Sequence, residues 1–335
     1  MTGTTARRLF QLTTVAFALA VRTVGASEAE DTTVTITSAT EGATPFIHQL
    51  KLNASDTSVI KSIKFSIAPK PGSVTRPLSG TYANAYLVAR GYVQANSIFI
   101  PVYGLYANYT NSVTLTYTFL DGSTSQDSTT ITTAAFVDPC GYSKPTILQE
   151  RKKAATLSYD YILIRSGCGT FSPTVIDTDG ALRWVGPAGI ASPHVNFFDN
   201  AFYITSGTSL YRIDLDGTVT FLHDYTDLGV ISFHHNVDHG KRGLILDANT
   251  ATHQESLNLE VDIAGNVVKM WDMVDVISEA MRAGDDNPDD FIVPSSDDWF
   301  HNNATAYNRA DDSLLISSRE NFVICLDYES LAIKW

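Results

Sequence analysis

Two side chains suited to binding an oxyanion stand at the ends of one predicted β-hairpin near the C-terminus. His301 and Arg319 lie nine residues on either side of Ala310. Ala310 belongs to a polar run, residues 308–313, that predicts a turn. This spacing makes the two residues nearly cross-strand partners at the open end of the hairpin. A histidine donor beside a permanent cation suits a tetrahedral anion such as sulfate. The alternative is an edge histidine and a solvated arginine.

A pair of adjacent histidines, His234 and His235, is the second feature that could carry chemistry. Successive residues of a strand point to opposite faces, so we expect only one of the two to face a shared site. Without acidic or thiolate companions in register the pair does not indicate a metal site, and we expect neither a metal nor a cofactor. The other histidines lack such a context and are expected to be surface or structural residues: His48, His194, His223, His239 and His253.

Composition narrows the possible partners. The formal charge of −13 argues against nucleic acid or an anionic membrane as a partner. The sequence contains no serine-hydrolase elbow, phosphate loop, dinucleotide fingerprint or H-E-x-x-H motif. Its 44% apolar residues, with 16 Phe and 15 Tyr, are ample for folded cores. A length of 335 residues fits two domains.

The first domain is predicted to be a β-sandwich over residues 32–137. Apolar residues alternate with polar ones in this region, as in Ile63, Phe65 and Ile67, which is typical of half-buried strands. The Asp121-Gly122 pair predicts a hairpin turn, and no part of the region has helical periodicity of useful length. About 100 residues of such strands favour a small sandwich.

A turn-rich linker, residues 138–145, leads to a loose repeat over residues 146–335. In each copy a strand enters an Asp-rich turn and a second strand follows that carries an aromatic residue. The turns lie at Asp177, Asp214, Asp262 and Asp327, with spacings of 37, 48 and 65 residues. Such spacings predict β-propeller blades with growing insertions, whose aromatic residues fill the gaps between neighbours. Unrelated hairpins are the alternative.

Two further features of the repeat are its largest insertion and the position of its fourth copy. Residues 275–298 contain a short amphipathic helix that ends at Gly284, followed by an acidic, proline-containing loop that is typical of a lid. The fourth repeat finishes at Trp335. Four blades rarely close a ring, so we expect the propeller within these residues to be incomplete.

Several features predict export to the extracellular space or, in a bacterium, to the periplasm. Residues 1–26 combine Arg7 and Arg8 with an apolar run and a small-residue cleavage site, which is typical of a signal peptide, and no segment is long enough to span a bilayer. Cys140 and Cys168 flank the start of the second domain and are expected to form a disulfide, whereas Cys325 lies in an apolar strand and is expected to be a buried free thiol. Three asparagines lie in glycosylation motifs: Asn53, Asn108 and Asn303.

The residues around the predicted hairpin resemble a known family. Residues 298–301, 311–319 and 333–335 are similar to the core motif of the arylsulfate sulfotransferases, enzymes that need no nucleotide sulfate donor. Residues 233–238 resemble an earlier histidine motif of that family, and residues 99–106 and 111–113 resemble its N-terminal β domain. The likeness covers most of residues 32–335 in patches.

The resemblance implies a β-sandwich followed by a six-bladed propeller with the site in its central channel. It also implies that a channel histidine takes a sulfuryl group from an aryl sulfate and passes it to a phenol, by covalent catalysis. His301 and Arg319 would hold the sulfuryl oxygens, with His235 as the upstream partner and His234 as its alternative. The sulfuryl-accepting histidine of the family falls in a later blade, after Trp335, so we expect this chain to lack it and to be inactive by itself.

Two other functions compete with sulfuryl transfer. The first is a non-catalytic secreted propeller that binds sulfated or phenolic ligands through the same basic site. The second is a quinoprotein-like dehydrogenase propeller, which shares blades with tryptophan but needs a cofactor and a cluster of metal ligands. The resemblance implies aryl sulfates and phenols as small-molecule partners, and the sequence leaves the oligomeric state open.

Overall fold

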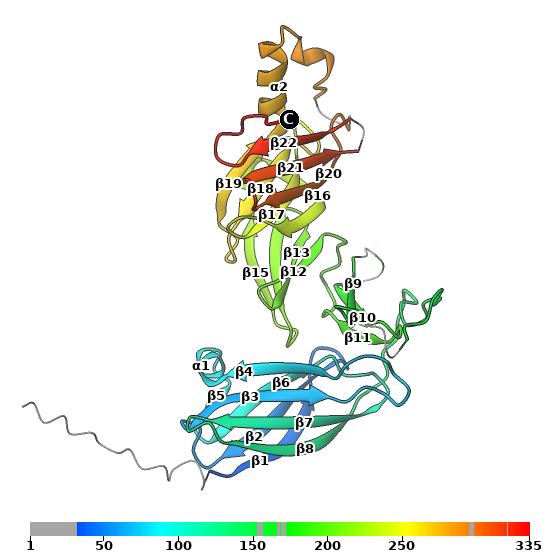
Figure 1. Cartoon of the computed structure of the whole chain (residues 1–335), viewed down its shortest axis with the longest axis vertical. Coiled ribbons are helices and arrows are strands. Elements are labelled where there is room, and N and C mark those ends of the chain that lie inside the picture. The colour runs from blue at the N-terminus through cyan, green and yellow to red at the C-terminus, as the bar shows by residue number, and fades with distance from the viewer. Residues whose placement is uncertain (1–31, 153–156, 166–167, 169–171, 295–297, 320) are drawn as a thin grey trace, which may run out of the picture.

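The computed structural model of the chain describes residues 32–152, 157–165, 168, 172–294, 298–319 and 321–335. The predicted signal peptide lies outside these residues and stays a prediction. Within the described part of the chain nearly all regular structure is β, in six antiparallel sheets (Figure 1). The predicted all-β class is confirmed. No described helix has the length and apolarity that a membrane-spanning helix needs.

The N-terminal region forms two four-stranded sheets that pack face to face (Figure 1). One sheet has the order β1-β2-β6-β5 and the other β4-β3-β7-β8. The strands are β1 (Val34–Glu41), β2 (Ile47–Ala54), β3 (Ile60–Ile67), β4 (Leu78–Ala83), β5 (Val93–Gln94), β6 (Ser97–Tyr103), β7 (Thr110–Phe119) and β8 (Thr124–Thr132). A six-residue helix, α1 (Asn84–Ala89), joins β4 to β5 and was not predicted.

Alternation of side chains builds the core of this sandwich. Ile63, Phe65 and Ile67 of β3 are all fully buried while the residues between them face outward. They pack against β2, β6 and β7 in one cluster of buried apolar side chains. The predicted turn lies between β7 and β8, where Gly122 has a φ of +88°, a conformation that L side chains rarely adopt.

Four further sheets follow along the chain, each with the meander order of a propeller blade. The first contains β9 (Tyr161–Ile164), β10 (Thr174–Asp177) and β11 (Leu182–Val185), and the second β12 (Val195–Phe198), β13 (Ala201–Ser206), β14 (Ser209–Asp214) and β15 (Val219–Asp224). The third contains β16 (Val230–His239), β17 (Leu244–Thr250), β18 (Leu257–Val261) and β19 (Val267–Asp272), and the fourth β20 (Asn302–Asn308), β21 (Ser313–Ser318) and β22 (Val323–Asp327). Short 3-10 turns lie at Thr226–Leu228 and Pro288–Asp290.

The Asp-rich turns of the repeat close hairpins, as predicted. In the second blade the amide of Gly217 donates to the carbonyl of Asp214 at 2.9 Å, and Gly217 has a φ of +86°. The aromatic residues after these turns behave less uniformly than predicted. Trp184 and Trp271 are buried, whereas Phe221 is 56% and Trp335 66% exposed. The expectation that each aromatic fills a gap between blades is therefore wrong for Phe221 and Trp335.

Neighbouring blades share apolar clusters. Tyr203 of the second blade packs with Phe233 and Leu246 of the third. Trp271 of the third blade packs with Phe300 and Leu314 of the fourth. Because each sheet buries its face against the next, the blades position the loops between them.

The predicted helical insertion is present as α2 (Met273–Ala283), after the third blade (Figure 1). The side chain of Asp272 caps its start by accepting a hydrogen bond from the amide of Val274 at 2.9 Å, and Gly284 ends it. Val276 and Ile277 are buried against the fourth blade's cluster.

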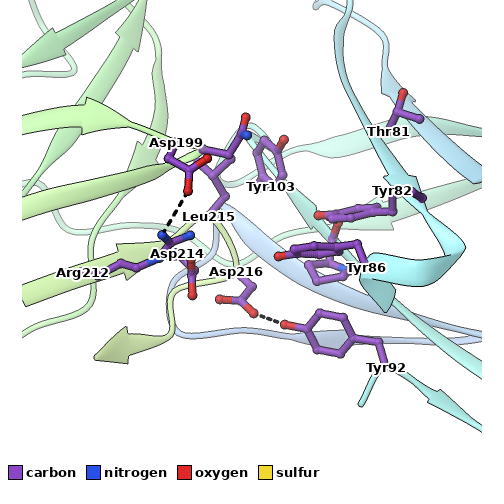
Figure 2. A pocket seen from close by; sticks show the side chains of 13 residues that line it. Thr81, Tyr82, Tyr86, Tyr92, Tyr103, Asp199, Arg212, Asp214, Leu215 and Asp216 are labelled. Carbon is purple, nitrogen blue, oxygen red and sulfur yellow. Dashed lines mark hydrogen bonds and ion pairs between the residues drawn. The ribbon is translucent and has the colours of Figure 1, made fainter. Parts of the chain in front are cut away.

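Polar contacts join the sandwich to the first two blades. Arg183, only 1% exposed, donates to the carbonyl of Gly104 at 2.7 Å, and Arg90 pairs with Asp214 at 2.8 Å. Between these regions lies a cavity of about 450 Å³ lined by tyrosines of the sandwich and acidic residues of the second blade (Figure 2). Its charged side chains already pair with one another, including Arg212 with Asp214.

The cysteines are arranged as expected. Cys140 and Cys168 form a disulfide with a Cα–Cα distance of 5.9 Å, which ties the linker to the first blade. Cys325 is free and buried in β22.

Candidate functional site: a histidine cluster between the third and fourth blades

The hairpin of the fourth blade brings His301 beside Arg319, as the spacing predicts. Asn302 pairs with Ser318 across β20 and β21, and the amide of Arg319 donates to the carbonyl of His301 at 2.9 Å. The polar residues between the two strands form the turn at the other end. Arg319 is half-exposed, and its guanidinium lies 3.6 Å from the carboxylate of Asp298.

His301 is held in an unusual conformation. Its φ is +48°, a left-handed conformation that costs a non-glycine residue roughly 1–2 kcal/mol. Its side chain is buried, and its Nδ1 hydrogen-bonds with Asp298 three residues earlier in the chain. The carboxylate therefore orients the ring so that Nε2 points away from Asp298.

A break in the strand register places both His234 and His235 near His301. His234 pairs with Asp247 of β17, but the next residue pair is Val237 with Leu246, so two residues of β16 bulge out of the ladder. The expectation that only one histidine of the pair reaches a shared site is wrong, because it assumed a regular strand. The bulge removes the alternation that would have turned the two rings to opposite faces.

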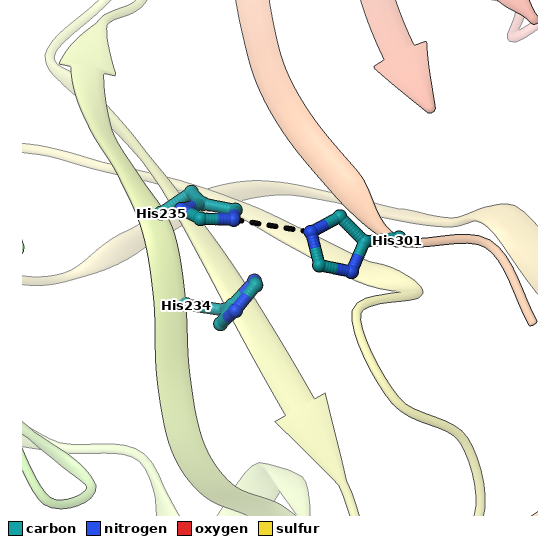
Figure 3. A group of neighbouring side chains, drawn as sticks. All are labelled: His234, His235 and His301. Carbon is teal, nitrogen blue, oxygen red and sulfur yellow. Dashed lines mark hydrogen bonds between the residues drawn. The ribbon is translucent and has the colours of Figure 1, made fainter. Parts of the chain in front are cut away.

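The three imidazole rings form one cluster (Figure 3). The Nε2 atoms of His235 and His301 are 3.2 Å apart, which is hydrogen-bond distance. The ring centroid of His234 lies 3.9 Å from that of His235 and 5.2 Å from that of His301. Residues from two blades therefore converge at one point.

Three carboxylates surround these rings, and the sequence did not predict them. Glu255 lies in the loop between β17 and β18, with its Oε1 3.0 Å from Nδ1 of His234 and its Oε2 3.5 Å from Nδ1 of His301. Asp247 is fully buried on β17, with Oδ2 4.0 Å from Nδ1 of His234. Asp298 completes the set. The signal that could have identified Asp247 is an acidic residue directly after the apolar run of residues 244–246 in β17.

The environment shifts the pKa of several of these groups. Burial lowers the pKa of His235, and the neighbouring His234 adds to the effect. Burial raises the pKa of Asp247 well above its usual range, and the charge of Glu255 raises it further. His194, expected to be an unrelated histidine, lies beside His234 with ring centroids 6.3 Å apart, and burial followed by repulsion from His234 lowers its pKa to about 4.

The other predicted sites lie away from this cluster. Asn53, Asn108 and Asn303 are exposed, so each is accessible to glycosylation, which stays a prediction. His48 is buried in the sandwich, and His223 lies against Tyr225 in the second blade. His239 and His253 contact aromatic rings, Phe198 and Trp299 respectively.

A β-sandwich followed by antiparallel blades, with a polar cluster between the third and fourth of these blades, defines a protein of the propeller class. Two family models match this chain: the arylsulfotransferase (ASST) model over residues 148–335 and the arylsulfotransferase Ig-like domain model over residues 52–134. The first match alone covers more than half of the chain. The chain therefore belongs to the arylsulfotransferase family.

Solved structures and curated proteins add little to this result. Chitinase ChiW from Paenibacillus sp. str. FPU-7 is similar with 13% identity and a TM-score of 0.24 over 32% of this chain and 9% of that chain. The AfRom2 CNH domain has 11% identity and a TM-score of 0.32, with 90% of this chain and 88% of that chain covered. The dihydro-heme d1 dehydrogenase NirN has 10% identity and a TM-score of 0.31, with 90% of this chain and 65% of that chain covered. These TM-scores are too low to support any inference. No curated protein matches the sequence significantly.

Proposed function

We propose that this protein binds the sulfuryl group of aryl sulfates and takes part in its transfer to a phenol, with His235, His301 and Arg319 holding the sulfuryl oxygens. The observation that carries the proposal is the convergence of His235 and His301 from two blades, with Nε2 atoms 3.2 Å apart, beside the backbone-linked Arg319. Family membership favours an aryl sulfate as the source of that group.

The transfer proceeds in two steps in this proposal. First the bond between sulfur and the phenolic oxygen breaks, the electron pair leaves with the phenolate, and a nitrogen–sulfur bond forms at an accepting histidine. A phenol oxygen then attacks sulfur, the nitrogen–sulfur bond breaks with its electron pair returning to the imidazole nitrogen, and the phenol's proton passes to solvent, which also supplies the proton that the released phenolate takes up. The protein's main task is to stabilise charge on the sulfuryl oxygens, which N–H donors and a guanidinium do well in a partly buried site.

Each of the three residues has a distinct part. His301 donates from Nε2 while Asp298 accepts at Nδ1 and fixes the ring, as carboxylates commonly do for catalytic imidazoles. His235 donates from the other side, with His234 as the alternative. Arg319 supplies a planar pair of donors that a lysine cannot match. By family resemblance the accepting histidine would follow Trp335 in sequence, so we assign that role to none of residues 1–335.

The test is the release of 4-nitrophenol from 4-nitrophenyl sulfate, with and without phenol. We expect the polypeptide 1–335 to release no burst of 4-nitrophenol, whereas a version extended through the accepting histidine turns over. In the extended version His301→Ala should lower the rate by about 10²-fold or more. A stoichiometric burst from the polypeptide 1–335 would instead make one of the clustered histidines the nucleophile. Binding without any turnover by the extended version would favour the non-catalytic alternative.

We also propose that the protein is secreted. The disulfide between Cys140 and Cys168 and the exposed positions of Asn53, Asn108 and Asn303 support this proposal. Removal of N-linked glycans from protein made in a eukaryotic secretory host should reduce its mass, and an unchanged mass would show that the three motifs are not used.

A further inference from the structure

A second group of potential ligands adjoins the contact between His235 and His301. It consists of His234 on β16, Asp247 opposite it on β17, and Glu255 in the loop before β18. One donor atom from each of the three lies within 4.8 Å of the others. The group belongs to a single blade, whereas the proposed sulfuryl site is shared between two.

The distances fit a small cation. Nδ1 of His234 is 3.0 Å from Oε1 of Glu255 and 4.0 Å from Oδ2 of Asp247. Ligands bound about 2.0–2.2 Å from a tetrahedral zinc ion lie roughly 3.3–3.6 Å from one another. Small side-chain movements therefore bring all three donors to bonding distance of one ion.

The two carboxylates are buried without adequate partners. Asp247 is fully buried and Glu255 is 3% exposed. Neither oxygen of Asp247 nor Oε2 of Glu255 has a hydrogen bond of normal geometry among the described residues, although the amide of Asn302 lies close enough to Asp247 to lower its pKa slightly against the effect of burial. A buried, unpaired carboxylate costs several kcal/mol, so such groups are normally paired or bound to metal.

Among the described residues, no lysine or arginine pairs with Asp247 or Glu255. In the part of the chain that the structure describes, the ion pairs of Asp247 and Glu255 are made with His234 and His301 alone. Asp298 adds a third carboxylate next to His301. Three carboxylates against one nearby guanidinium, that of Arg319, leave excess negative charge that would oppose a sulfate ester.

We infer that His234, Asp247 and Glu255 bind one divalent transition-metal ion of the zinc class. One imidazole and two carboxylates are hard-to-borderline ligands that suit zinc better than calcium or magnesium, which prefer oxygen ligands alone. The ion neutralises the two buried carboxylates and leaves an open coordination position, because the protein supplies three ligands. It also removes the charge that opposes an anion at His235 and His301. The inference does not depend on sulfuryl transfer.

The test is metal binding, which needs no sulfate ester. The polypeptide 1–335, stripped with a chelator and dialysed, is titrated with Zn²⁺ and separately with Mg²⁺ and Ca²⁺ by isothermal calorimetry. We expect one Zn²⁺ per chain with a Kd of about 1 µM or tighter, and no comparable binding of Mg²⁺ or Ca²⁺. At a hundredfold excess over Kd, Zn²⁺ should raise the Tm by about 5 °C or more.

Variants assign the ligands. Asp247→Asn and His234→Gln should each weaken Zn²⁺ binding about 10²-fold. Asp238→Asn, a carboxylate on the same strand outside the group, should leave it unchanged. His301→Gln should also retain the ion, which separates this site from the other acidic groups around His301. If Asp247→Asn does not fold, the wild-type titration and His234→Gln still decide.

Two results would overturn the inference. The first is wild-type protein that binds no Zn²⁺, together with an Asp247→Asn variant at least as stable as wild type, since Asp247 would then be a neutral, protonated acid. The second is Zn²⁺ binding that is lost in His301→Gln and retained in His234→Gln, which would place the ion elsewhere. Both results concern metal binding alone, and the binding of 4-nitrophenyl sulfate is measured separately.

Discussion

Nε2 of His235 and Nε2 of His301 lie 3.2 Å apart although the two residues come from different blades and are separated by 66 positions in sequence. At this distance one of the two nitrogens donates a hydrogen bond to the other. An oxyanion placed against the pair can accept from both rings once each is protonated at Nε2. In the proposed function, the contact between the third and fourth blades therefore binds the sulfuryl group as well as packing the two sheets together.

Asp298→Asn should weaken the binding of 4-nitrophenyl sulfate about 10- to 100-fold. The carboxylate accepts from Nδ1 of His301 and lies 3.6 Å from the guanidinium of Arg319, so its loss releases both groups. Asp311→Asn, on the exposed turn at the other end of the same hairpin, is the control and should bind normally. Equal affinities for the two variants would remove Asp298 from the site.

The disulfide should stabilise the junction between the linker and the first blade. Cys140→Ser should lower the free energy of unfolding by about 3–4 kcal/mol, because the bond closes a loop of 28 residues in the denatured state. Urea denaturation measures the change. The control is Cys325→Ser, which removes the free thiol and leaves the disulfide in place. This variant should not show the loss of stability that reduction of the disulfide with dithiothreitol causes.

Trp271 should be a major packing residue between the third and fourth blades. It is fully buried in contact with Tyr328, so Trp271→Ala should lower the free energy of unfolding by about 3–5 kcal/mol. Phe221 holds the equivalent place in the second blade but is 56% exposed. Phe221→Ala should therefore cost much less, and equal losses would contradict the assignment of packing roles.

The contact between the sandwich and the first blade should weaken in acid. Burial alone would raise the pKa of Asp160, but hydrogen bonds from Arg151 and Arg76 outweigh it and lower that pKa below its ordinary value of 3.8. On acidification the unfolded chain therefore binds this proton first. The stabilisation is complete above about pH 4 and is lost as the pH falls through the lowered pKa. Asp160→Asn should reduce the slope of the free energy of unfolding against pH in this range. An unchanged slope would exclude Asp160 as the source of the pH dependence.

The sequence predicted the fold well where side-chain alternation and turn residues act locally. The strands of the sandwich, the Asp-rich blade turns and the end of α2 at Gly284 all follow from such signals. The hairpin with His301 and Arg319 followed from counting residues on either side of one turn.

The remainder of the site depended on features without a local signal. The bulge after His234 arises from pairing with β17, and nothing in residues 233–238 marks it. Glu255 and Asp298 meet the histidines only because separate loops fold back onto the same blade contact. Phe221 is exposed together with Val219 and Thr220 in β15, the edge strand of its sheet, a position that the repeat pattern alone does not indicate.

The most direct test of the sulfuryl site is equilibrium binding of 4-nitrophenyl sulfate to the polypeptide 1–335 by isothermal calorimetry. We predict saturable binding of one ligand per chain that both His301→Gln and Arg319→Lys weaken about tenfold, the second although it keeps the positive charge. Arg309→Lys, an exposed arginine in the turn of the same hairpin, should have no effect. Binding that neither His301→Gln nor Arg319→Lys alters, or no binding by wild-type protein, would contradict the assignment of the sulfuryl-binding residues.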